Sequence, residues 1–219
     1  MRKIRVKIGA ILMLLAMVAS DGALLLVIYF LSAALHECGH LIAARALGIG
    51  IEEVRFDFSG VRICTDKSIN SYGAEFVLAA AGPLVNLFEV TLCVAVFSFL
   101  GISIPEATVA VLQFLEGELS LVGAVGFFAA ASALQGGINL LPINTLDGGR
   151  MLFCATALIF GEHCASAAIK ATSFAAAFIL WTVALYLLLK VSAGLGVFVF
   201  AACVFTSTAG NSNKSAILA

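Results

Sequence analysis

The sequence predicts an all-α polytopic membrane protein with about six transmembrane helices and a small membrane-associated β-hairpin between the second and third. Hydrophobic residues make up 62% of the chain and charged residues 11%, whereas an ordinary soluble domain carries about 25% charged residues. The mean hydropathy is +1.12. Because no internal repeat or polar linker divides the apolar runs, we expect one transmembrane domain over residues 1–219.

The first apolar run, Ile8–Ala19, follows a basic start and has two interpretations. It could be a signal peptide cleaved near Val18-Ala19-Ser20, or a short retained span counted from about Ile4. We favour the retained span because further membrane helices follow.

The later spans are apolar runs of near-membrane length. They are expected at about Ala23–Leu47, Ala74–Leu100, Leu119–Leu141, Ala171–Leu189 and Ser192–Thr208.

Two shorter elements and a loop lie between these spans. From Ile51 to Asp66 apolar and polar residues alternate around Ser59-Gly60, which predicts the β-hairpin. A short helix is expected over Met151–Phe160, and Ile102–Glu118 is interpreted as a loop.

The placement of lysine and arginine predicts the orientation. With the N-terminus in the cytoplasm and six alternating spans, every basic residue except Lys190 falls on the cytoplasmic side. The opposite loop, Ile102–Glu118, holds three glutamates and no basic residue. We therefore expect a multi-pass protein of the cell membrane in contact with the bilayer and without a nucleic-acid partner.

The second predicted span carries the motif His36-Glu37-Cys38-Gly39-His40. Histidines four residues apart lie on one face of a helix, where both can bind Zn²⁺, and the adjacent glutamate can deprotonate a water on the metal. The motif predicts one zinc ion per chain with its ligands toward the cytoplasmic end of the span.

A catalytic zinc usually has three protein ligands, and Asp147 is the favoured third. It follows Pro142 and precedes Gly148-Gly149, where the fourth span must break, and it lies level with the histidines if the spans alternate. Two alternatives remain: Asp147 could only cap the following helix, or Glu89 of the third span could be the ligand.

Three sequence elements together resemble the site-2 protease family of intramembrane metalloproteases. They are the HECGH motif, the stretch Asn139-Leu-Leu-Pro-Ile-Asn-Thr-Leu-Asp-Gly-Gly-Arg150, and Ala81-Gly82-Pro83-Leu84-Val85-Asn86, which is similar to that family's G-P-x-x-N element. The resemblance covers about residues 23–160, the expected zinc-site core. In layout the chain is most similar to the stage IV sporulation branch.

The resemblance implies a role for each matched residue. It implies His36, His40 and Asp147 as zinc ligands, Glu37 as general base, and Asn139 as a contact to the substrate carbonyl or the oxyanion. Supporting positions are Gly82, Pro83 and Asn86. The family often has proline where this chain has Asn144 and Thr145, which predicts a less rigid loop before Asp147.

The resulting hypothesis is an intramembrane zinc metalloendopeptidase that cleaves within or beside the transmembrane segment of a membrane-anchored protein. The implied setting is regulated intramembrane proteolysis, which could activate a transcription or sigma factor, with a membrane regulatory protein as a further partner. The alternatives are a catalytically idle relative that binds transmembrane partners, and a metal transporter, which would need more histidine or aspartate ligands than this chain has.

Overall fold

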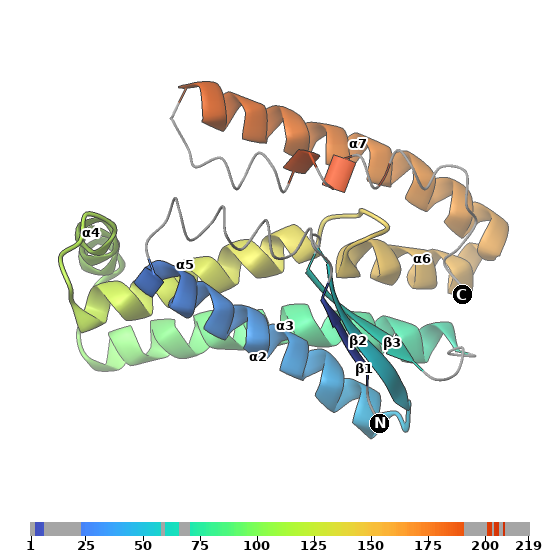
Figure 1. Cartoon of the computed structure of the whole chain (residues 1–219), viewed down its shortest axis with the longest axis horizontal. Helices are drawn as coiled ribbons and strands as arrows, with labels where there is room; N and C mark the ends of the chain where they lie inside the picture. The colour runs from blue at the N-terminus through green and yellow to red at the C-terminus, as the bar shows by residue number, and fades with distance from the viewer. Residues whose placement is uncertain are drawn as a thin grey trace.

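The computed structural model describes residues 3–6, 23–57, 60–65 and 71–190, together with residues 201, 202, 204, 205 and 208. This part of the chain forms six helices and three strands (Figure 1). The helices are α2 (Ala23–Ala46), α3 (Tyr72–Phe99), α4 (Ile104–Leu115), α5 (Leu121–Asn139), α6 (Asp147–Phe160) and α7 (Glu162–Lys190). The strands are β1 (Lys3–Val6), β2 (Ile51–Asp57) and β3 (Gly60–Thr65).

Four of the described helices are long and apolar enough to cross a membrane: α2, α3, α5 and α7. Large aliphatic and aromatic side chains such as Leu87 and Phe88 of α3 are more than 60% exposed. Apolar surface of this extent is what a bilayer would cover, and the chain is therefore a multi-pass membrane protein.

The two outermost predicted spans fall mainly outside the described residues. The predicted start of the first span, at about Ile4, is wrong. Lys3–Val6 forms strand β1, so a helix cannot begin there. Most of the span predicted at Ser192–Thr208 also lies outside the described part.

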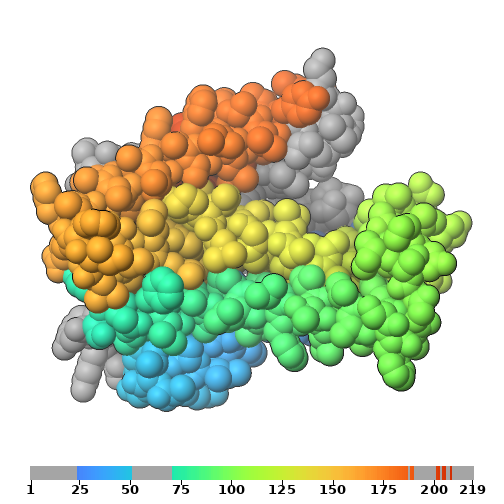
Figure 2. Space-filling model, turned by 180° about the vertical axis from the view of Figure 1, so that it is seen from behind, coloured from blue at the N-terminus to red at the C-terminus, as the bar shows by residue number. Residues whose placement is uncertain are grey.

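Helix α3 is the centre of the bundle. It packs against α2, α5 and α6, while α7 packs on α6. Figure 2 shows α3 running along the molecule between α2 on one side and α5 and α6 on the other. Side chains on α3 can therefore reach three other helices at once.

The strands form one sheet in the order β1–β2–β3. Strands β2 and β3 pair antiparallel, with Val54 opposite Ile63, in the segment where the sequence predicts a hairpin, and residues 58–59 between them lie outside the described part. Strand β1 pairs parallel with β2, with Ile4 opposite Val54. This third strand was not predicted.

One helix was not predicted, and two others begin earlier than predicted. Helix α4 lies where a loop was predicted, and it begins with a capping box in which the Ser103 and Glu106 side chains each bond the other's backbone N–H. Helix α7 begins at Glu162 rather than Ala171, and α6 begins at Asp147 rather than Met151.

Candidate metal site

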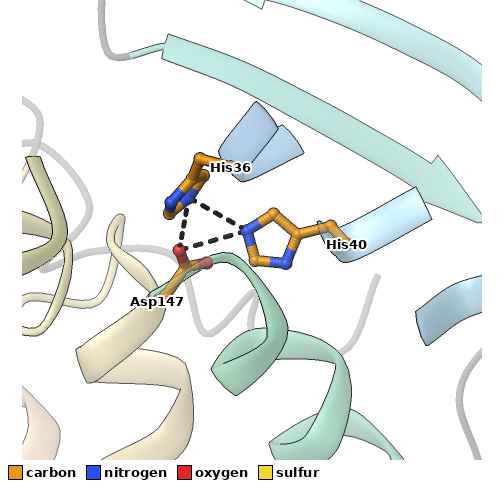
Figure 3. A group of neighbouring side chains, drawn as sticks. All are labelled: His36, His40 and Asp147. Carbon is orange, nitrogen blue, oxygen red and sulfur yellow. Dashed lines mark hydrogen bonds and ion pairs between the residues drawn. The ribbon is translucent and has the colours of Figure 1, made fainter. Parts of the chain in front are cut away.

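Helices α2 and α6 bring His36, His40 and Asp147 together, although more than a hundred residues separate the aspartate from the histidines. Figure 3 shows the three side chains pointing toward one another. The Asp147 Oδ2 atom lies 3.2 Å from Nε2 of His36 and 3.2 Å from Nε2 of His40. The two Nε2 atoms are also 3.2 Å apart, so the three atoms form an equilateral triangle.

The size of this triangle suits a zinc ion. Ligand atoms about 2.0 Å from a tetrahedral zinc lie about 3.3 Å from one another, close to the 3.2 Å edges observed. Both histidines are buried, and the Asp147 side chain is 13% exposed. The donor set therefore fits a three-ligand site whose fourth position is free for water.

The far ring nitrogens of both histidines have hydrogen-bond partners that fix the rings. Nδ1 of His36 lies 2.6 Å from Oδ1 of Asn86, and Nδ1 of His40 lies 2.8 Å from the carbonyl oxygen of Leu78. A carbonyl oxygen can only accept, so each Nδ1 donates and each Nε2 carries a lone pair. Two nitrogen lone pairs and a carboxylate oxygen thus converge on one point, an arrangement that a bound cation would satisfy.

Gly82 of α3 leaves the space in front of these lone pairs open. A Cβ atom at this position would lie 2.4 Å from Nε2 of His40 and 2.5 Å from Nε2 of His36. Any larger residue would therefore fill the place where the metal would bind. The next residue, Pro83, is buried within α3 and has no backbone N–H to donate to the preceding turn.

The start of α6 positions Asp147. Leu146 is the N-cap residue and makes no side-chain capping bond, so Asp147 is the first helical residue and its carboxylate is directed to the histidines. The interpretation of Asp147 as the helix cap is therefore wrong. Gly148 and Gly149 follow Asp147 directly. They lie in the first turn of α6, where added Cβ atoms would lie 2.1 Å and 2.0 Å from carbonyl oxygens of the preceding loop.

That loop packs against α7. The Ser173 hydroxyl of α7 accepts a hydrogen bond of 2.8 Å from the Asn144 backbone N–H and lies 3.4 Å from the Pro142 carbonyl oxygen. Ile143 is fully buried and Leu146 nearly so, in a cluster that includes Ala177 of α7.

Glu37 and Asn139 also lie at the candidate site. Glu37 is half-buried and close enough to His36, His40 and Asp147 for its charge to interact with theirs. Asn139 is the last residue of α5, and its Nδ2 atom lies 3.4 Å from Nε2 of His36. A carboxylate and an amide therefore border the position that the metal would occupy.

Glu89 is not part of the triangle. Its carboxylate accepts from the Ser32 hydroxyl at 3.0 Å and from the Asn86 amide at 3.3 Å. Asn86 hydrogen-bonds two residues of α2, His36 and Ser32. Cys38 is exposed and takes no part in the site.

Sequence reasoning missed the polar residues that surround Asn86. Ser32 lies one helical turn before His36 on the same face of α2, and Ser132 and Gln135 are one turn apart on α5. The Ser32 hydroxyl lies 2.9 Å from the Ser132 hydroxyl and 3.2 Å from Oε1 of Gln135. The helical spacing of these few polar residues within apolar spans was the signal that could have identified them.

Comparisons with known proteins place the chain in a family. The model of peptidase family M50 matches residues 23–184. The zinc metalloprotease MJ0392 of Methanocaldococcus jannaschii is 29% identical over 130 residues, which is 59% of this chain and 33% of that protein. The Synechocystis protein sll0528 is 30% identical over 131 residues, 60% of this chain and 31% of that one. The chain thus spans about a third of the length of these relatives.

A solved structure has the same fold. The site-2 protease from Methanocaldococcus jannaschii superposes with a TM-score of 0.62 at 22% sequence identity, covering 100% of this chain and 94% of the other. The family match covers most of the chain. The chain therefore belongs to peptidase family M50.

Proposed function

We propose that this member of peptidase family M50 is an intramembrane zinc endopeptidase that hydrolyses a peptide bond within or beside the transmembrane segment of a membrane-anchored protein. The observation that carries the proposal is the 3.2 Å triangle of two histidine nitrogens and an aspartate oxygen, with a glutamate beside it. Both histidines lie on α2, a helix long enough to span a bilayer. In a soluble metalloprotease, the helix that carries the metal ligands would not be surrounded by exposed apolar side chains.

Each residue at the site has a proposed role. His36, His40 and Asp147 would hold one zinc ion per chain, which when bound acts as a Lewis acid and lowers the pKa of its water toward about 7. Glu37 accepts the proton of the attacking water and passes it to the leaving amine. The Asn139 amide donates to the substrate carbonyl oxygen as negative charge develops there. The position of its Nδ2, 3.4 Å from a ligand nitrogen, supports this role.

The sheet supports a proposal for how substrate is presented. A transmembrane helix satisfies its own backbone groups, so it must unwind before a peptide bond can be cleaved. Strand addition at the edge of a sheet would satisfy the released N–H and C=O groups. We place the membrane-associated sheet of β1, β2 and β3 in this role because β3 is an edge strand among the strands that the structure describes.

The cellular setting follows from charge and layout. The basic residues favour an N-terminus and active site that face the cytoplasm, in a cell-membrane protein with the bilayer around it. Regulated intramembrane proteolysis with a transcription- or sigma-factor precursor as substrate, under a membrane regulatory protein, is the setting we favour. On the layout of its sequence alone, we assign the chain to the stage IV sporulation branch.

Glu37→Gln tests the proposal. The substitution removes the base while all three metal ligands remain, so we expect zinc content equal to wild type and loss of cleavage of a membrane-anchored reporter in liposomes. Cys38→Ser, at the exposed neighbouring position, is the matched control and should retain both. Cleavage by the Glu37→Gln protein would refute the assignment. Zinc binding without cleavage in the wild type, across a panel of transmembrane substrates, would favour the idle binding protein.

A further inference from the structure

A cluster of buried polar side chains lies between α2, α3 and α5, next to the candidate metal site. Ser32 and Ser132 are fully buried, Asn86 is 1% exposed and Glu89 5% exposed. Polar and ionisable groups inside a membrane protein are costly to bury and usually have a function. The proposed mechanism gives Glu89 no role, although Glu89 is the acid of this cluster.

Asn86 connects the cluster to the metal ligand His36. Its Oδ1 lies 2.6 Å from Nδ1 of His36, while its Nδ2 points away, 3.3 Å from the Ser32 hydroxyl and 3.3 Å from Oε2 of Glu89. The oxygen and nitrogen ends of an amide have nearly the same shape. Packing alone therefore cannot choose between the two orientations, and the hydrogen-bond partners decide.

The partners of Nδ2 are themselves held in place. The Ser32 hydroxyl donates to Oε2 of Glu89 at 3.0 Å and lies 2.9 Å from the hydroxyl of Ser132. Oε2 therefore accepts from both Ser32 and Asn86. With the Glu89 carboxylate on its far side, the Asn86 amide can donate to both Glu89 and Ser32 when its NH₂ group faces them. In the reversed orientation the amide oxygen would lie against the carboxylate oxygen, where both atoms accept and no hydrogen bond forms.

The orientation of Asn86 has a chemical consequence at His36. With Oδ1 facing the ring, Nδ1 carries the proton and Nε2 has the free lone pair that a metal needs. If the amide turned round, its NH₂ group would face Nδ1, which would have to accept. The ring proton would then move to Nε2, and this nitrogen would no longer be a ligand.

We propose that Glu89, together with Ser32, is a positioning residue that fixes the orientation of the Asn86 amide and, through it, the metal-binding tautomer of His36. The proposal rests on the zinc site of the proposed function. In this proposal Glu89 of α3 binds no metal and contacts no substrate, but it determines how readily His36 binds the metal.

The test is the zinc affinity of the full-length protein in detergent, measured by competition with a chromophoric chelator. Outer hydrogen-bond partners of ligating histidines contribute about 10–100-fold to metal affinity. We expect Glu89→Leu to weaken zinc binding by about this factor, and Ser32→Ala to weaken it in the same direction by less. Thr91→Val, which removes an exposed hydroxyl from the same helix, should bind zinc as the wild type does.

A compensating substitution separates this mechanism from a loss of packing. Both oxygens of an aspartate can accept, so the Asn86→Asp side chain cannot be placed the wrong way round. We expect Asn86→Asp/Glu89→Leu to bind zinc more tightly than Glu89→Leu and close to the wild type. If Glu89→Leu does not fold, as judged by gel filtration and thermal unfolding of the metal-free protein, Glu89→Gln with and without Asn86→Asp carries the same comparison, because the glutamine NH₂ group can face the Asn86 oxygen and no second carboxylate stands beside Asp at position 86.

Two results would overturn the inference: wild-type zinc affinity in folded Glu89→Leu, or no recovery in the double variant. Neither result would affect the proposed function, which depends on zinc binding by the wild type. Failure of the wild type to bind zinc would instead reject the metal site itself before the variants are compared.

Discussion

Replacing Gly82 by alanine should block the candidate metal site with a single methyl group. The added Cβ would lie 2.4 Å from Nε2 of His40 and 2.5 Å from Nε2 of His36. Non-bonded carbon and nitrogen atoms rarely approach closer than about 3.4 Å, so α3 would have to move from α2 by about 1 Å, or both rings would have to rotate. Either change breaks the 3.2 Å triangle.

The expected magnitude is a loss of at least about 100-fold in zinc affinity, or about 2.7 kcal/mol. Overpacking should also lower the free energy of unfolding by about 1–3 kcal/mol, less the gain of about 0.8–1.0 kcal/mol that alanine brings to a helix interior. The assay is chelator competition, with thermal unfolding in parallel. Gly73→Ala is the matched control on the same helix, because its Cβ would have only an ordinary contact, 3.6 Å from the Ser71 hydroxyl. Wild-type zinc affinity in Gly82→Ala would refute the geometry described for the site.

Three further substitutions test other parts of the structure. Arg150→Leu leaves the buried carboxylate of Glu75 without its 3.3 Å partner, so the free energy of unfolding should fall by about 1–3 kcal/mol. Most of this loss should be recovered by adding Glu75→Gln, and denaturation in detergent measures both. Ser103→Ala removes the cap of α4 and should cost about 0.5–2 kcal/mol without any change in zinc affinity. Gly149→Ala would place a Cβ 2.0 Å from the Ile143 carbonyl oxygen, so it should displace the start of α6 and weaken zinc binding, and unchanged binding would contradict the role given to that glycine.

The parts of the fold that could be predicted are those with a local signal. Long apolar runs identify α2, α3 and α5, and the four-residue spacing of His36 and His40 depends only on the helical repeat. Helix α4 was missed because its 12 residues are too few to span a membrane. Its Ser103-x-x-Glu106 capping pattern, with proline in the first turn, was present in the sequence but was not used.

The errors at other boundaries have different physical origins. Strand β1 depends on pairing with β2, about fifty residues away, and four residues have no periodicity that would reveal such a partner. Helix α6 was predicted to begin late because Gly148 and Gly149 have low helix propensity. In the structure, close packing of the preceding loop on their backbone outweighs that propensity.

The candidate site, like the fold, could be predicted only in part. Asp147 could be placed near the histidines by counting spans, because two helices that run in the same direction end at similar depth. The hydrogen-bond partners could not be placed, since His36, Asn86 and Glu89 meet only through the packing of α2 on α3. Side-chain contacts between helices depend on rotation about the helix axes, which the sequence alone does not specify.

The most direct measurement of the central claim is the zinc content of the purified full-length chain, compared between the wild type and Asp147→Ala. The substitution removes one corner of the triangle and leaves both histidines on α2. We expect about one zinc per wild-type chain and a large loss of zinc in the variant, because two ligands bind zinc far more weakly than three. Full retention of zinc by Asp147→Ala, or no zinc in the wild type, would contradict the site described here.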